Sequence, residues 1–270
     1  MYLLENMTWA QAKEAFAKCK TAIIPWGSIE QHGSLPLGTD FFVAEYMAED
    51  LAKRDYPAIV TPVIPVGFAD YHTDFPGTLT LSNETVSAMA TEICRKLISY
   101  GITHILFYNC HGGNQAPLGR VCYDLRNKGF VGAVFMWYEL AGKINFKWAA
   151  LGHGDVVEAE IVEVHRPGVL NIEGVGRPVQ NDLGELKVPR RSVVTFEDIM
   201  QVHIGMRSED FTKSGAMLEP HLYPGADHGQ WFEEFDTAKA APMRTAVNDY
   251  VVRFLPEFEK IKFDPICEKF

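Results

Sequence analysis

Short apolar runs alternate with amphipathic segments over much of the chain. Apolar runs bounded by glycine, proline or polar residues predict strands at residues 22–24, 58–66, 103–108 and 132–136. The prolines within 58–66 favour an edge strand or a break near Pro65. Apolar residues at helical spacing, with cap signals, predict helices at residues 8–17, 41–54, 83–100, 115–128 and 156–164. This alternation predicts an α/β fold with three layers, α/β/α, around a mainly parallel sheet.

The regular pattern ends near Pro167. Gly, Pro, Asp and Glu are scattered through residues 168–236, with a strand-like piece at 192–196, and a final helix is predicted at 238–258. Residues 137–148 fit more than one kind of structure. Because the sequence contains no repeat and no low-complexity linker, we expect a single domain over residues 1–270, with its core in 21–166.

Composition narrows the classes of partner. The net charge of −10 and the isoelectric point near 5.4 disfavour binding to nucleic acid or to an anionic membrane. The five cysteines are odd in number and lack C-x-x-C spacing, which suits free thiols in a reducing compartment. We expect no signal peptide, no membrane span and a cytoplasmic protein that acts on a small molecule.

A loop rich in potential metal ligands follows the first predicted strand. Glu30 and His32 are two residues apart, so in an extended segment both side chains point to the same side. Asp40 follows in the same loop, and His111 follows another predicted strand. Because the carboxyl ends of parallel strands meet at one edge of the sheet, we expect these ligand types to converge there. The alternative for Asp40 is an N-cap of a helix that begins at Phe41.

A second group of candidates lies further along the chain. His153 and Glu158 stand at the start of the predicted helix, where Asp155 and Glu158 also fit a capping box. The segment 75–78 predicts a rigid turn, because proline and glycine fix its backbone. We expect His104 and His165 to be structural, whereas His203, His221 and His228 could line a pocket or lie in surface loops.

Three motifs identify a family resemblance. They are G-S-x-E-Q-H-G-x-L-P-L-x-T-D at 27–40, H-x-x-F-P-G-T at 72–78 and N-x-H-G-G-N at 109–114. Together they resemble the creatininase family of metal-dependent amidohydrolases, in the family's order and over residues 21–166. A fourth motif departs from the family: this chain has H-G-D-V-V-E-A-E at 153–160 where the family shows H-A-G-x-x-E-T-S.

The resemblance implies a creatininase-like fold and two divalent metal ions, Zn²⁺, Mn²⁺ or Fe²⁺. It implies that Glu30, Asp40 and His111 hold one ion. The other would be held by His32, Asp40 and Glu158, with Asp40 as the bridge and His153 as the acid/base. It also implies a homo-oligomer, often a hexamer, and a substrate pocket formed by Ala69, Tyr71, His72, Phe75, Gly77, Thr78, Gly112 and Gly113.

Several positions differ from the family pattern. Ala69 stands where serine is frequent and Tyr71 where an acidic residue is frequent, so the pocket is expected to differ. Creatininase proper carries a glutamate at the position of Gly113, and creatinine is therefore not the favoured substrate. Cys110 stands where the family usually has glycine, and we expect it to be a small apolar core residue and not a metal ligand.

Three functions remain open. The first is hydrolysis of a C–N bond in a cyclic amide or an N-acyl compound. The second is hydrolytic C–C ring opening of a diketo-inositol, for which the altered pocket and the unusual stretch 207–234 are the motivation. The third is metal binding without catalysis, against which the full set of expected ligands argues.

Overall fold

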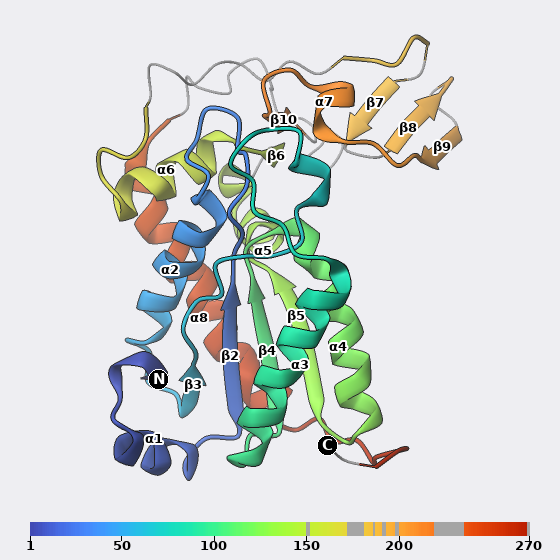
Figure 1. Ribbon diagram of the computed structural model, residues 1–270. Helices are drawn as coiled ribbons and strands as arrows, with labels where there is room; N and C mark the ends of the chain where they lie inside the picture. The colour runs from blue at the N-terminus through green and yellow to red at the C-terminus, as the bar shows by residue number, and fades with distance from the viewer. Residues whose placement is uncertain are drawn as a thin grey trace.

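Five parallel strands form the central sheet of the computed structural model, which describes residues 1–149, 152–171, 181–185, 187–190, 193–197, 200–218 and 235–268. The strand order is β1-β3-β2-β4-β5, and every paired neighbour is parallel. Figure 1 shows β3, β2, β4 and β5 side by side with their arrowheads pointing the same way. Their bounds are β1 (Tyr2–Leu3), β2 (Thr21–Trp26), β3 (Ala58–Val60), β4 (His104–Asn109) and β5 (Val131–Met136).

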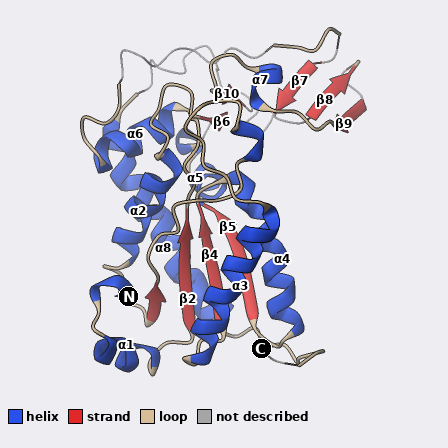
Figure 2. Ribbon diagram, viewed as in Figure 1, coloured by secondary structure: helices blue, strands red, loops and turns tan. Residues whose placement is uncertain are grey.

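Helices cover both faces of this sheet, as Figure 2 shows. One apolar core joins the sheet to α1 (Trp9–Phe16), α3 (Asn83–Ser99) and α4 (Gln115–Asn127). The other core joins it to α2 (Thr39–Leu51), α5 (Trp137–Ile144), α6 (Val156–His165) and α8 (Ala240–Phe258). The predicted α/β/α architecture is confirmed.

The continuous apolar runs follow from burial on both faces. Side chains alternate along a strand, so Ile23 packs into one core and Ile24 into the other. In β4, Leu106 and Phe107 divide in the same way. All six residues of β2 and all six of β4 are buried, which is why neither strand shows a polar face.

Smaller elements lie beyond the carboxyl ends of the strands (Figure 1). They include the antiparallel pair β6 (Gly152–His153) and β10 (Met217–Leu218), the short α7 (Ser208–Phe211), and an antiparallel sheet of β7 (Lys187–Arg190), β8 (Val193–Phe196) and β9 (Met200–His203). Single 3-10 turns are η1 (Leu4–Asn6), η2 (Asp70–His72), η3 (Gly112–Asn114), η4 (Phe146–Trp148) and η8 (Thr237–Lys239). Within the described part of the chain, no helix has the length and apolar character that a membrane crossing requires.

Most helix predictions are confirmed to within two or three residues. Thr8 accepts a hydrogen bond from the Gln11 N–H and forms a capping box with Gln11 at the start of α1. Ser82 caps α3. The segment 137–148, which fitted more than one structure, forms α5 and then η4, and the final helix begins with η8.

Two local predictions were wrong. The strand expected at 58–66 ends at Val60, because Pro62 and Pro65 have no N–H to donate to a sheet. Asp40 is not an N-cap, since α2 begins at Thr39 and Asp40 lies inside its first turn. A separate finding concerns Asn114, which precedes α4: its side chain makes no cap hydrogen bond and donates to the carbonyl of Gly27 at 3.0 Å.

The two histidines expected to be structural lie away from the ligand loop. His104 donates from Nε2 to the carbonyl of Ile261 at 3.0 Å. His165 lies in the last turn of α6, 3.2 Å from Glu45 Oε2. Cys110 is buried in an apolar core, as expected of a small apolar residue. His203 falls in β9, and His221 and His228 lie outside the described residues, as does most of the stretch 207–234.

Candidate metal centre

The centre forms where two adjacent strands end. β2 leads into the loop that carries Glu30 and His32, and this loop leads into α2, whose first turn carries Asp40. β4 is the neighbour of β2 and leads through Cys110 to His111. All four side chains are buried, at 0% to 3% exposure. The convergence predicted from the shared edge of parallel strands is confirmed.

Gly27 allows the ligand loop to leave β2 close to α2. A Cβ atom at this position would lie 2.7 Å from Phe41 Cα and 2.8 Å from the carbonyl oxygen of Asp40. Any side chain there would push the loop away from the helix. The first glycine of the motif therefore sets the separation between the loop ligands and Asp40.

Asp40 faces a different imidazole with each of its oxygens. Its Oδ1 lies 3.1 Å from His32 Nε2, and its Oδ2 lies 2.9 Å from His111 Nδ1. Glu30 Oε1 lies 3.1 Å from the same His111 nitrogen. Asp40 therefore stands between two histidines.

Backbone carbonyls fix the tautomers of both histidines. His111 donates from Nε2 to the carbonyl of Phe68 at 2.7 Å, and His32 donates from Nδ1 to the carbonyl of Glu30 at 3.1 Å. In a neutral ring the other nitrogen then carries a lone pair, and in both rings that nitrogen faces the carboxylates. This arrangement is the one that metal-binding histidines adopt.

The donor set fits a divalent cation. Glu30 Oε1 and Asp40 Oδ2 are buried and accept no hydrogen bond from the described residues. A lone pair of His111 would face these two oxygens repulsively unless a proton or a cation lay between them. Buried carboxylate and imidazole ligands of this kind suit zinc, manganese and iron.

The charges of the centre lead to the same conclusion. Burial alone would lower the pKa of His32, but the surrounding carboxylates, Asp40 foremost, outweigh it and raise that pKa to about 10. At His111, burial would also lower the pKa. Nearby charges, that of Glu30 first among them, outweigh burial and hold the pKa of His111 well above its ordinary value. Burial would raise the pKa of Asp40, and the two imidazoles lower it to about 2. The centre therefore requires positive charge, as protons on its histidines or as bound cations.

Glu158 is both a cap and a neighbour of the centre. Asp155 accepts hydrogen bonds from the N–H groups of Val157 and Glu158, and Glu158 Oε2 accepts from the Gly154 N–H at 2.9 Å. Burial, reinforced by the nearby Asp155 and Asp40 carboxylates, holds the pKa of Glu158 well above its usual range, although His32 opposes this. The helix-capping alternative is therefore realised: Asp155 caps α6, and the side chain of Glu158 reaches back to the N–H of Gly154 and not to that of Asp155.

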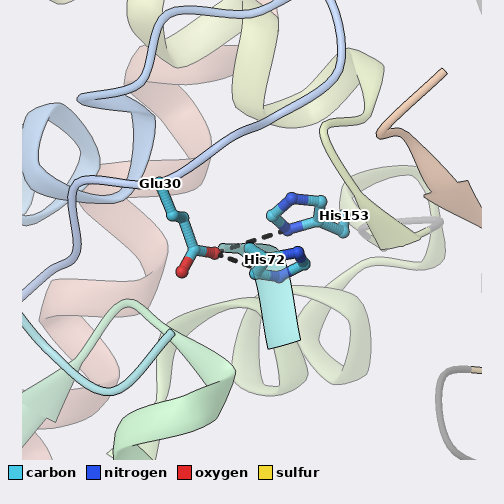
Figure 3. A group of neighbouring side chains, drawn as sticks. All are labelled: Glu30, His72 and His153. Atoms are coloured by element: carbon cyan, nitrogen blue, oxygen red, sulfur yellow. Dashed lines mark ion pairs between the residues drawn. The ribbon is translucent and has the colours of Figure 1, made fainter. Parts of the chain in front are cut away.

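Two triads of donor atoms lie close enough to share a cation. One is Glu30, His32 and Asp40, and the other is Glu30, His72 and His153; within each, the atoms lie within 4.8 Å of one another. Figure 3 shows the second triad, in which both imidazoles face the carboxylate of Glu30. His153 does not stand at the entry of a helix, as predicted, but in β6, where it pairs with Met217.

The predicted pocket residues lie at varied depths. Thr78 contacts the centre, because its Oγ1 donates to the His72 carbonyl and accepts from the Gln31 N–H, each at 3.1 Å. Ala69 is fully buried, and its N–H donates to Thr80 Oγ1. Phe75, Tyr71, Gly112 and Gly113 are partly exposed, and Gly77 is exposed.

Gly113 is required by its surroundings. A Cβ atom there would lie 2.0 Å from the Phe68 carbonyl oxygen and 2.5 Å from His111 Nε2. The Tyr71 hydroxyl would lie 2.3 Å away. Any side chain at position 113 would therefore collide with the hydrogen bond that orients His111.

Two residues of the centre were missed from the sequence. Gln31 lies 2.8 Å from His72 Nδ1 through its Nε2 atom, and Ser208 Oγ lies 2.5 Å from the same nitrogen. The position of Gln31 between two predicted ligands was a usable signal. Ser208 carried none, because it is 136 positions from its partner.

Fold and site together define an α/β protein with a carboxylate–imidazole cluster, a candidate cation centre, at the carboxyl edge of its sheet. A family profile described as creatinine amidohydrolase matches residues 5–235. The chain belongs to the creatininase family.

Two curated relatives match part of the chain. A mycofactocin precursor peptide peptidase from Mycolicibacterium smegmatis is 33% identical over 113 residues, which are 40% of this chain and 45% of that protein. A 3-dehydro-scyllo-inosose hydrolase from Thermotoga maritima is 30% identical over 110 residues, which are 40% of this chain and 35% of that protein. The matched segments thus span less than half of either relative.

Solved structures share the fold over nearly the whole chain. A Bacteroides fragilis protein assigned as a creatinine amidohydrolase superposes with a TM-score of 0.70 at 17% identity, covering 96% of this chain and 97% of that one. A creatininase mutant described as Zn-Zn type has a TM-score of 0.67 at 16% identity, and a creatininase described with Mn has 0.62 at 17%. Each of these two covers 95% of this chain and 98% of its own. At these identities the likeness establishes the fold.

Proposed function

We propose that this protein is a dinuclear metal-dependent hydrolase that acts on a small polar substrate. The observation that carries the proposal is the orientation of Asp40, whose two oxygens face His32 and His111 separately. A carboxylate placed in this way is suited to bridge two ions. Family membership supports the proposal, as do the solved creatininases described with zinc and manganese.

The ligands divide between two positions. Glu30, Asp40 and His111 would hold one ion, and the distances from His111 to both carboxylates suit this set. His32, Asp40 and Glu158 would hold the other, with Glu158 Oε2 still accepting from the Gly154 N–H. Zinc, manganese and iron(II) all accept such ligands. Ions bound there would polarise a carbonyl group and make water acidic near pH 7.

His153 is the proposed proton carrier. Its Nε2 donates to the carbonyl oxygen of Gln31 at 2.5 Å, so in the neutral ring the unprotonated nitrogen is Nδ1. That nitrogen lies 3.7 Å from Glu30 Oε1, on the side of the centre. His153 Nδ1 would take a proton from the attacking water and deliver it to the leaving nitrogen, which restores the neutral ring.

Cleavage of a C–N bond is the favoured reaction. The name of the Mycolicibacterium smegmatis relative, a precursor peptide peptidase, supports amide hydrolysis. The second candidate is hydrolytic C–C ring opening of a cyclic polyol diketone, which the name of the Thermotoga maritima relative supports. Both reactions begin with water attacking a polarised carbonyl, so the same centre could serve either.

Mass spectrometry of a mixed substrate panel with metal-loaded protein tests this function. One half of the panel is cyclic amides, N-formyl compounds and short peptides, and the other half is cyclic polyol ketones. We expect a gain of one water, or loss of a formyl group, in the amide half. Turnover confined to the ketones would move the assignment to C–C cleavage. No turnover in either half by protein that carries two metals per chain would contradict a hydrolase of this type.

A further inference from the structure

We propose that His72 is a further catalytic residue of this centre, whose Nε2–H donates a hydrogen bond to the substrate oxygen on which negative charge develops. The proposal rests on the hydrolase function above and assigns His72 a role distinct from that of His153. In this arrangement the two stacked imidazoles offer the substrate a donor and an acceptor side by side.

The first observation is the position of His72. It is fully buried at the end of η2, and its ring stacks on His153 with centroids 4.4 Å apart and planes 12° apart. Its Nε2 points toward Glu30 Oε1 at 3.6 Å, as Figure 3 shows. On the opposite side of the ring, Nδ1 is held by Gln31 and Ser208. The ring is therefore fixed in place with one nitrogen toward the centre.

The second observation is that Gln31 sets the tautomer of His72. Gln31 Oε1 accepts a hydrogen bond from the Gly33 N–H at 3.0 Å, which identifies the oxygen end of this amide. The nitrogen end therefore faces His72 Nδ1, 2.8 Å away, and an amide nitrogen can only donate. The Ser208 hydroxyl oxygen lies 2.5 Å from Nδ1 and 2.9 Å from the Tyr71 carbonyl oxygen, and the hydroxyl can rotate to donate to Nδ1. With Gln31 as the donor, His72 Nδ1 is an acceptor, and the proton of the neutral ring lies on Nε2.

The same residue sets the tautomer of His153. Two atoms of Gln31 approach His153 Nε2, the backbone carbonyl oxygen at 2.5 Å and the side-chain Nε2 at 3.2 Å. The carbonyl oxygen can only accept and makes the shorter contact, so His153 Nε2 carries the proton. Both rings are thus protonated on Nε2, yet they present opposite atoms to the centre. His72 turns its N–H toward Glu30, and His153 turns its unprotonated Nδ1 toward it. Gln31 acts through both rings and is a positioning residue.

This assignment decides between two interpretations of the triad Glu30, His72 and His153. A third cation there would need a lone pair on His72 Nε2, which the contact with Gln31 removes. A hydrogen-bond donor at the same place suits the oxyanion that forms when water adds to a carbonyl. His72 keeps its proton throughout, while the proton of the attacking water moves to His153 Nδ1 and then to the leaving group.

A matched pair of substitutions separates this role from a structural one. In His72→Gln the amide nitrogen takes the approximate place of Nε2 and preserves the donor. In His72→Asn the amide takes the place of Nδ1, so the contacts with Gln31 and Ser208 remain possible and the donor is lost. We expect His72→Asn to lower kcat by about 100-fold, and His72→Gln by much less, with two metals per chain in both. The reverse order would overturn the proposal, because it is the order that a structural role predicts.

Neutron diffraction from perdeuterated, zinc-loaded crystals tests the tautomers without any substrate. We expect deuterium on Nε2 of both His72 and His153. Deuterium on His72 Nδ1, or a zinc ion bound to His72, would overturn the proposal even in an active enzyme. Failure of the whole substrate panel would count against the hydrolase function, and the neutron result would still decide the tautomer of His72.

Discussion

Asp40 and His111 face one another across the centre, with Asp40 Oδ2 2.9 Å from His111 Nδ1. The other nitrogen of this imidazole donates to the Phe68 carbonyl, so a neutral ring turns a lone pair toward the carboxylate. Glu30 Oε1 adds a second negative oxygen at 3.1 Å from the same nitrogen. The backbone therefore holds these groups in an arrangement that is stable only with positive charge between them.

Replacement of His153 by alanine should abolish turnover without loss of metal. His153 is not among the proposed metal ligands, and its Nδ1 is the proposed proton carrier, so we expect kcat to fall by about 10²- to 10⁴-fold. Metal content measured by plasma mass spectrometry should stay at the wild-type level. The control is His165→Ala, in the last turn of α6 beside Glu45, which should leave turnover within a few-fold of wild type. Simultaneous loss of metal from His153→Ala would show that His153 is a ligand.

Replacement of Gly113 by alanine should disturb the metal position that contains His111. The new Cβ would fall 2.0 Å from the Phe68 carbonyl oxygen, the acceptor that orients His111. We expect weaker metal binding in isothermal titration and a loss of roughly 1–3 kcal/mol in the free energy of unfolding.

Gly119→Ala on α4 is the matched control for Gly113→Ala. A Cβ atom at Gly119 meets nothing within 4 Å, so alanine should stabilise the helix by roughly 0.5–1 kcal/mol. If both glycine variants bound metal like the wild type, the packing around Gly113 would not matter for the centre.

Glu160 should make the stability of the fold depend on pH. Its Oε1 accepts from the Asp236 N–H at 2.8 Å and from Lys239 Nζ at 3.3 Å. Burial nevertheless raises the pKa of Glu160 to about 7. Because this pKa is higher in the folded chain than in the unfolded chain, its contribution to stability is complete below about pH 4 and is lost as the pH rises through 7.

Glu160→Gln removes that dependence. We expect the free energy of unfolding of the wild type to fall by about 2–3 kcal/mol relative to the variant between pH 5 and pH 8. Urea denaturation of both proteins in metal-free buffer measures the difference, since the histidines of the centre contribute equally to each. Parallel stability curves over this range would contradict the assigned pKa.

The sequence revealed the layers of the fold because its core strands are buried on both faces. β2 and β4 are continuous apolar runs for that reason, and each ends in the residues that lead to the centre. The extent of β3 was not predictable from apolar content alone. Residues 61–66 are as apolar as a strand, but their prolines cannot take part in a ladder.

The positions of the main candidate ligands were predictable for a geometric reason. Glu30, His32 and His111 follow adjacent parallel strands, and such strands bring their carboxyl ends to one place. The hydrogen bonds that fix the tautomers were not predictable. The acceptor for His111 is a backbone carbonyl 43 positions away, and the partner of His72 is a serine 136 positions away. Contacts of this kind depend on the folded chain and leave no pattern in the sequence.

Metal stoichiometry of Asp40→Asn tests the central claim most directly. The control is Asp50→Asn, which changes another buried aspartate of α2 that bonds Arg54 and Asn248 instead of the centre. If Asp40 bridges two ions, plasma mass spectrometry should find about two metals per chain in the wild type and in Asp50→Asn, and neither metal retained in Asp40→Asn. Full occupancy in Asp40→Asn, or a wild type that takes up no metal when titrated with zinc or manganese, would contradict the dinuclear centre.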